Sequence, residues 1–238
     1  MLAAGLAEVC GAGSVIGLHL NYGLRHDSDL DESTCAELCG ALGIRSRIVP
    51  MTDDRVATLV DTPAGRLEFQ DYFVGRRQSD DVLGVTFAGI ERATSHPHAL
   101  AAIREADAVV IAPSNPIVSI APILSTPGMR EALADTAAPI VAVSPIVGGR
   151  ALKGPAAQML ATLGHEVSAL GVARLYAGLI DGLVIDEVDR ELAPAIELTG
   201  PRVLVTATVM GDDADRRRLA TEVLDFAASL AGERAAAL

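Results

Sequence analysis

The stretch "ADAVVIAPSNPIVSIAPIL", residues 106–124, shows most directly how this chain folds. Residues 107–113 form a short apolar run rich in β-branched side chains, which is typical of a buried strand. The run ends at Ser114 and Asn115, which stand between two prolines. In open α/β sheets, ligands bind beyond the carboxyl ends of the strands. We therefore expect a buried strand that leads into a polar turn at such an end. These residues alone favour a plain capped turn, with a turn that contacts a ligand as the alternative.

Helix and strand patterns alternate over the rest of the chain. Residues 95–106 open with cap-type residues and continue as a helix, and the same alternation runs from "GMREALADT" to the helix "DADRRRLATEVLDFAASLAGE". This alternation predicts an α/β fold with a doubly wound, mostly parallel sheet. Near residues 55–75 the period changes, and "RVATLVDT" and "GRLEFQDYFVG" predict two strands of an inserted β-hairpin that turns at "TPAG".

Composition excludes several classes of function. The 238 residues carry a formal net charge of -12 and only 3% aromatic residues, which suits strands covered on both faces and disfavours binding to nucleic acid. The sequence has no apolar run as long as a membrane span, and its three cysteines lack the spacing of zinc or disulfide sites. We expect one compact, reduced, cytoplasmic protein with no nucleic-acid or membrane partner.

The segment 144–156 follows another predicted strand and suggests a phosphate site. Gly148 and Gly149 would let the backbone approach a ligand, Lys153 supplies a positive charge, and Gly154 with Pro155 opens a helix. The spacing matches neither a Walker loop nor the GxGxxG pattern, so an ordinary glycine-rich loop with a surface lysine remains the alternative.

The acidic residues are expected to be caps and solvated charge. This applies to the adjacent pairs Asp53-Asp54, Asp80-Asp81 and Asp212-Asp213. It also applies to Asp186 and Asp189 in "DEVDRE", which we expect to be exposed, with binding of a hard cation as the alternative. The five histidines form no metal pattern, and no GxSxG elbow supports hydrolysis by a serine nucleophile.

Five segments, in their order along the chain, resemble the 2-phospho-L-lactate transferase (CofD) family of coenzyme F-420 biosynthesis. They are "MTDDRVATLVDTPAGRLEFQDYFVGRR", "ADAVVIAPSNPIVSIAPIL", "APIVAVSPIVGGRALKGPA", "EVSALGVARLYAGLIDGLVIDEVD" and "RVLVTATVMGDDADRRRLA". The resemblance implies a Rossmann-like fold and a magnesium-dependent transfer. A phospholactyl-type group would pass from a guanosine-diphosphate-linked donor to the hydroxyl of the deazaflavin Fo, with release of GMP. It also leaves a homodimer open.

The resemblance further implies which residues line the nucleotide and phosphate pocket, whereas the catalytic residues and metal ligands stay unassigned. The pocket residues are Pro113, Ser114, Asn115, Pro116, Ser119, Ser144, Pro145, Gly148, Gly149, Lys153 and Gly154.

The beginning of the chain departs from the family. Residues 1–45 read as a divergent or truncated segment without the family's GGxGG loop, and residues 46–238 as the CofD-like α/β domain. One register lays residues 23–33 on the family's Asp-Leu-Asp-Thr element, which makes Asp29 and Asp31 metal candidates. The register that we prefer fits residues 32–54 to a later helix and strand. Residues 18–44 also resemble a segment of tRNA-lysidine synthetases, but the SGGxDS loop of those enzymes is missing.

Two functions other than the transferase remain consistent with the sequence. Ala207 stands where the family has an aspartate, which removes one expected polar contact. Together with the missing loop, this keeps a non-catalytic nucleotide-binding regulator, or an inactive copy on the related gluconeogenesis-factor fold, as the alternative to a transferase. An α/β domain without any ligand is the third reading.

Overall fold

A parallel four-stranded sheet forms the centre of the protein. The computed structural model describes residues 16–19, 47–152 and 154–236. The sheet has the order β11-β10-β7-β6, with every neighbouring pair parallel. Its strands are β6 (Val109–Ile111), β7 (Ile140–Val143), β10 (Gly182–Ile185) and β11 (Arg202–Val205). The predicted α/β fold with a mostly parallel sheet is confirmed.

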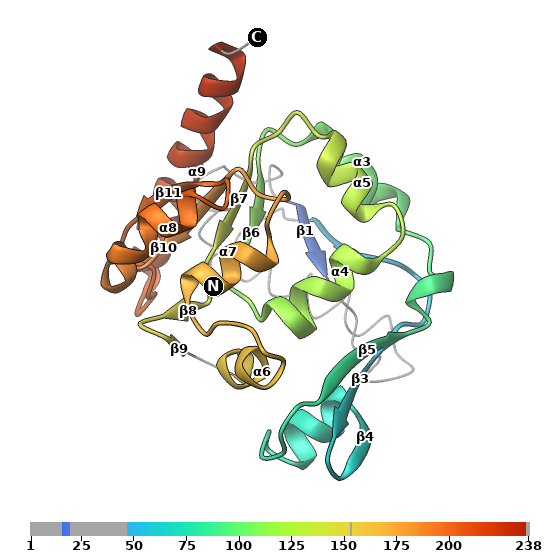
Figure 1. Ribbon diagram of the computed structural model, residues 1–238. Helices are drawn as coiled ribbons and strands as arrows, with labels where there is room; N and C mark the ends of the chain where they lie inside the picture. Colours follow the sequence, from blue (N-terminus) through green and yellow to red (C-terminus); the bar gives the residue numbers. More distant parts are fainter. Residues whose placement is uncertain (1–15, 20–46, 153, 237–238) are drawn as a thin grey trace.

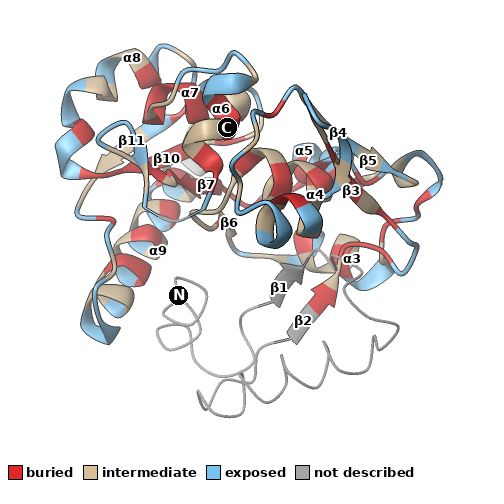
Figure 2. Cartoon of the chain, turned by 90° about the horizontal axis from the view of Figure 1, so that it is seen from below, coloured by how far each residue is buried: buried red, intermediate tan, exposed pale blue. Residues whose placement is uncertain are grey.

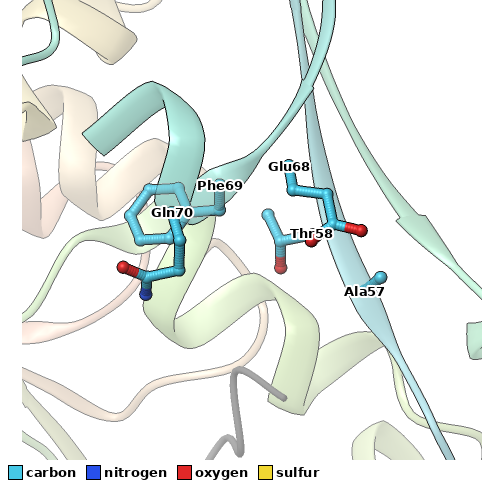
Figure 3. Close-up of a pocket in the computed structure, with 5 residues that line it drawn as sticks. All are labelled: Ala57, Thr58, Glu68, Phe69 and Gln70. Carbon is cyan, nitrogen blue, oxygen red and sulfur yellow. The ribbon is translucent and has the colours of Figure 1, made fainter. Parts of the chain in front are cut away.

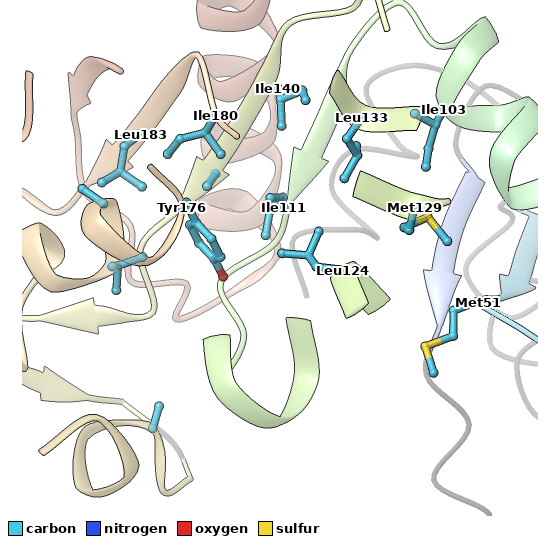
Figure 4. Packing of buried hydrophobic residues seen from close by; sticks show 14 of the residues in the cluster. Met51, Ile103, Ile111, Leu124, Met129, Leu133, Ile140, Tyr176, Ile180 and Leu183 are labelled. Atoms are coloured by element: carbon cyan, nitrogen blue, oxygen red, sulfur yellow. The ribbon is translucent and has the colours of Figure 1, made fainter. Parts of the chain in front are cut away.

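Both faces of the two central strands, β7 and β10, are buried, as the sequence pattern predicts. Along β7, Ile140 and Ala142 pack into one apolar cluster, and Val141 and Val143 pack into another on the opposite face. The first cluster extends across the sheet to the helices over that face (Figure 4). Buried residues gather in the strands and on the helix sides that face them (Figure 2). A strand covered on both sides has no polar face, which explains its continuous apolar sequence.

Helices connect the strands and cover the sheet. They are α3 (Pro97–Glu105), α4 (Ala121–Ser125), α5 (Met129–Asp135), α6 (Ala156–Thr162), α7 (Ala169–Leu175), α8 (Ala193–Glu197) and α9 (Asp213–Ala236). The predicted cap of α3 is present, because the His96 ring nitrogen accepts from the backbone N–H of His98 at 3.2 Å. Helix α9 packs on this second cluster through Leu219, Ala220, Val223, Ala227 and Leu230.

Two smaller strand pairs lie beside the main sheet. Strands β1 (Ile16–His19) and β2 (Arg47–Pro50) are parallel, and Figure 1 places them on the β6 side of the main sheet. Strands β8 (Ile146–Val147) and β9 (Arg150–Ala151) form a short antiparallel hairpin after β7.

The predicted insertion is a three-stranded antiparallel sheet that extends from the body of the protein (Figure 1). Its strands are β3 (Ala57–Thr62), β4 (Gly65–Glu68) and β5 (Gly84–Ala88), in the order β4-β3-β5. The hairpin is confirmed, but its predicted second strand is too long. Residues Asp71–Gly75 form a helical turn, η1, instead.

Burial of one side chain explains this difference. Tyr72 is 0% exposed and packs against Val60, Val82, Val118 and Met159, whereas Val74 is 66% exposed. In a strand, residues 72 and 74 would lie on the same face. A helical turn separates the two side chains, so Tyr72 alone enters the cluster.

Candidate functional site

The four parallel strands end at one edge of the sheet, which we call the carboxyl edge. Polar residues follow each strand there: Ser114 and Asn115 after β6, Ser144 after β7, Asp186 after β10, and Thr206 and Thr208 after β11. Neighbouring strands bring these segments side by side, because Ile111 pairs with Ala142 and β10 pairs with both β7 and β11. The carboxyl edge therefore gathers polar groups from four parts of the chain.

Asn115 caps the helical turn that begins after β6. Its Oδ1 accepts from the backbone N–H groups of Ile117, at 2.9 Å, and Val118, at 3.4 Å. The capped turn is η3 (Pro116–Ile120), and a proline at the first helical position has no N–H to leave unpaired. The structure thus contains the capped turn that the sequence predicts at Ser114 and Asn115. Pro113, Ser114 and Ser119 are half-buried, and Pro116 is buried.

The segment after β7 makes a tight turn. The Ser144 hydroxyl donates to the Ile146 carbonyl at 2.9 Å and accepts from the Ile146 N–H at 3.2 Å. Pro145 follows and leads into the β8–β9 hairpin, whose two-residue loop is Gly148-Gly149. Their φ angles are +56° and +73°, which glycine adopts readily. The turn therefore supplies a conformational reason for both glycines, separate from any approach to a ligand.

Lys153, the predicted positive charge, lies outside the described residues. Gly154 has a φ of +73°, and Pro155 precedes α6 without a capping hydrogen bond from its side chain.

The structure places the predicted turn after β6 against helix α6. The Asn115 Nδ2 group lies 3.4 Å from the Met159 sulfur, which belongs to the helix that follows residues 144–154. Val118 and Met159 also share one buried apolar cluster. The turn after β6 is therefore packed on helix α6, which follows the segment after β7.

Asp186 and Asp189 are buried, so the predicted exposure of both residues is wrong. Each is 6% exposed. Asp186 accepts from the Val188 N–H through Oδ1 and from the Thr208 N–H and hydroxyl through Oδ2. Asp189 accepts from the Gly148 N–H at 2.9 Å. A buried carboxylate is tolerated where such donors compensate its lost hydration.

Sequence reasoning missed these two residues because "DEVDRE" reads as a charged surface run. One signal was available for Asp186. It follows directly on the buried strand β10, the same position that Ser144 takes after β7, and Ser114 comes three residues after the end of β6.

The surroundings of Asp186 favour its ionised form. Burial alone would raise the pKa of Asp186, but hydrogen bonds from the Thr208 backbone, the Val188 backbone, the Thr208 hydroxyl and the Val209 backbone lower it. The resulting pKa lies below the ordinary value of an aspartate. Asp186 is therefore a fixed negative charge at neutral pH.

A second charged group lies where β11 ends. Arg218 donates to the Ala207 carbonyl at 2.7 Å and to Glu222 at 3.0 Å. The Thr206 hydroxyl donates to the same Glu222 carboxylate at 2.5 Å. Arg218 was not predicted from the sequence, and it places a guanidinium beside the position where the family resemblance expects an aspartate.

The described part of the chain gives no complete metal site. Over residues 16–19, 47–152 and 154–236, no group of three histidine, cysteine, aspartate or glutamate side chains is placed to hold a metal. One of the acidic pairs supplies a predicted cap, because Asp212 lies at the start of α9, whereas Asp54 accepts from a residue 40 positions away that begins no helix. Asp54 accepts from the Thr94 N–H at 2.7 Å, and Asp212 accepts from the Asp215 N–H at 2.9 Å. The metal candidates Asp29 and Asp31 lie outside the described residues.

Two hollows lie away from the carboxyl edge. One, of about 20 Å³, is lined by Thr58, Glu68 and Phe69 in the insertion (Figure 3) and is large enough for about one water molecule. The other, of about 330 Å³, is open and lies at the amino ends of the strands, beside Ile140 and Asp181. Neither hollow is lined by the polar residues that follow the four parallel strands.

None of the helices in the described part of the chain is both long and apolar enough to cross a bilayer.

Comparison with known proteins gives consistent results. The model of a family described as 2-phospho-L-lactate transferase CofD matches residues 21–222. A 2-phospho-L-lactate transferase of Methanocaldococcus jannaschii is 41% identical over 90% of this chain and 68% of its own length. A phosphoenolpyruvate transferase of Streptomyces griseus is 39% identical over 80% of this chain and 61% of its own length. The chain thus spans about two thirds of the length of these relatives, or less.

A solved structure supports the fold. A crystal structure of a UPF0052 family protein from Bacillus halodurans superposes with a TM-score of 0.52 at 14% identity. The likeness covers 81% of this chain and 66% of that one.

Proposed function

The chain belongs to the CofD family of 2-phospho-L-lactate transferases, and from this premise we propose that it acts as a transferase in coenzyme F-420 biosynthesis. It would move a phospholactyl-type group from a guanosine-diphosphate-linked donor to the hydroxyl of the deazaflavin Fo. The acceptor oxygen would form a bond to the phosphorus that carries the acid, the bond between this phosphorus and the guanylate would break, and GMP would leave. The hydroxyl proton would pass to solvent.

One observation carries this proposal more than any other. The stretch that matches the family model includes every polar strand end of the carboxyl edge, from Ser114 to Thr208. Ligands of open α/β sheets bind at such an edge. Phosphoryl transfer depends mainly on positioning and on charge neutralisation, so a rigid edge with polar groups from several strands suits the reaction.

The described residues have separate tasks in this proposal. The exposed parts of Ser114 and Ser119 would contact the nucleotide, while Asn115 keeps their turn in shape through its cap. The segment from Ser144 to Gly154 would hold the phosphates, with Lys153 as the predicted charge partner. No described residue is assigned to the acceptor site.

The identity of the transferred acid is a separate question. One relative is named for phospho-L-lactate and another for phosphoenolpyruvate, at nearly equal identity to this chain. Both guanosine-diphosphate-linked donors therefore belong in the assay.

Magnesium is proposed as the cofactor on the family resemblance. Mg²⁺ usually binds through one or two carboxylates together with substrate phosphates and water. The test is to repeat every nucleotide titration with Mg²⁺ and with EDTA. Tighter binding only with Mg²⁺ supports the proposal, and equal affinity in both contradicts it.

The deciding experiment is calorimetric titration of the purified chain with GDP and then with Fo, followed by mass spectrometry of the products made from each donor. Binding of both ligands and formation of a phosphorylated Fo product would support the transferase. GDP binding without Fo binding or turnover would favour the nucleotide-binding regulator. Binding of neither ligand would contradict both functions. Sedimentation equilibrium of the same sample tests the homodimer.

A further inference from the structure

We infer that Asp189 is a positioning residue that fixes the Gly148-Gly149 turn at the carboxyl edge and thereby sets the affinity of the site for its nucleotide. The inference rests on the proposed function and adds to it a residue outside the predicted pocket. Its basis is the 2.9 Å hydrogen bond from the Gly148 N–H to Asp189 Oδ2, which joins residues 41 positions apart in the sequence.

Asp189 is buried, unlike the other charged residues of its helical turn. It lies in the helical turn η4 (Glu187–Leu192), where Glu187, Arg190 and Glu191 are exposed and Asp189 is 6% exposed. Burying a carboxylate is unfavourable unless hydrogen bonds replace its hydration. A backbone N–H that donates to a carboxylate makes a stronger bond than one that donates to a neutral acceptor. Burial of Asp189 and its bond to the turn therefore depend on each other.

The turn needs such an attachment. Strands β8 and β9 have two residues each, and an isolated hairpin of this size is only marginally stable. Ile146 anchors the base of the hairpin, because its side chain is fully buried. At the tip, a Cβ on Gly148 would lie 3.6 Å from Val188, so the tip rests against η4. Asp189 supplies the hydrogen bond that fixes the tip in this place.

The position of the tip matters for the ligand. The hairpin is part of the segment 144–154 proposed to hold the phosphates, and helix α6 after it packs on Asn115. The Gly148 N–H itself is occupied by Asp189 and would not bind the phosphate. Asp189 would thus affect nucleotide binding indirectly. It would fix the conformation of the Gly148-Gly149 turn, and this conformation would position the other groups of the segment 144–154 for contact with the nucleotide.

The test compares Asp189→Ala and Asp189→Asn in the full chain, with Glu191→Ala as a matched control on the same turn. The GDP dissociation constant is measured by calorimetry, and KM and kcat for the donor by product formation. We expect Asp189→Ala to weaken GDP binding about 10-fold and to raise KM more than it lowers kcat. The Asn variant keeps an oxygen acceptor, so it should stay within about 3-fold of wild type, and Glu191→Ala should match wild type.

A readout without ligand keeps this inference separate from the proposed function. The exchange rate of the Gly148 amide hydrogen, followed by NMR, should rise about 10-fold or more in Asp189→Ala and stay low in Asp189→Asn. If wild type binds no GDP, the proposed function fails and this exchange rate decides whether Asp189 holds the turn. Wild-type exchange and affinity in a folded Asp189→Ala variant would overturn the inference, as would equal losses in the Ala and Asn variants.

Discussion

Asp186 Oδ2 lies 2.8 Å from the backbone nitrogen of Thr208 and 3.0 Å from its hydroxyl, so the carboxylate that follows β10 holds the segment that follows β11. The two residues are 22 positions apart in the sequence. Thr208 is itself 5% exposed, which places the whole contact away from water. Two neighbouring strand ends are therefore fixed to each other by one buried charge.

Removing this charge should destabilise the protein. In Asp186→Ala the buried N–H and hydroxyl of Thr208 lose their acceptor, as does the N–H of the exposed Val188, and the free energy of unfolding should fall by about 3 kcal/mol. Urea unfolding followed by circular dichroism at neutral pH measures the change. The control is Glu187→Ala, an exposed neighbour, which should stay within about 0.5 kcal/mol of wild type. Equal stability of the two variants would contradict the prediction.

The lowered pKa of Asp186 predicts how this contribution varies with pH. A carboxyl whose pKa is lower in the folded state stabilises the fold above its unfolded pKa, which is about 3.9 for aspartate. The contribution is lost as the pH falls through the lowered, folded pKa. Wild type should therefore lose more stability than Asp186→Asn as the pH falls from about 5 to below the folded pKa. Urea unfolding at a series of pH values tests this, and parallel profiles would show that Asp186 does not titrate as described.

Asn115 can be tested for two tasks at once. Asn115→Ala removes the cap of η3 and should reduce the free energy of unfolding by about 1 kcal/mol, together with weaker GDP binding. Asn115→Asp keeps a capping oxygen and should retain the stability. Thermal unfolding and calorimetric titration of both variants separate the tasks. If Asn115 contributes only the cap, the Asp variant will also bind GDP as wild type does; if its amide contacts the nucleotide, the Asp variant will be stable but will bind weakly.

The Gly148-Gly149 turn makes a prediction about the backbone. Both residues have positive φ angles, which an alanine adopts at a free-energy penalty of about 1–2 kcal/mol. Gly148→Ala and Gly149→Ala should each reduce the free energy of unfolding by that amount. Gly75→Ala is the control, since Gly75 has no positive φ and an added Cβ there would meet no atom within 4 Å. Chemical unfolding measures all three variants, and a neutral Gly149→Ala would argue against the turn geometry.

The residues at the strand ends show which structural features local sequence patterns can predict. The strand before Ser114 and the cap formed by Asn115 depend on neighbouring residues, so a short stretch of sequence was enough to predict both. Helix η1 was missed because Tyr72 is buried by side chains from β3, η3 and α6, which no local pattern contains. At residues 71–75 the choice between a strand and a helical turn depends on which side chains enter this apolar cluster.

The sequence by itself determined the alternation of helices and strands, the parallel sheet and the polar turns at its edge, because periodicity, capping and turn preferences act over a few residues. Tertiary structure alone decided which of the charged residues became buried. Asp186 and Asp189 belong to one acidic run with exposed neighbours, and their burial depends on donors at Thr208 and Gly148, 22 and 41 positions away. The free energy of burying a charge is set by the groups that surround it in space, and a linear pattern does not contain that information.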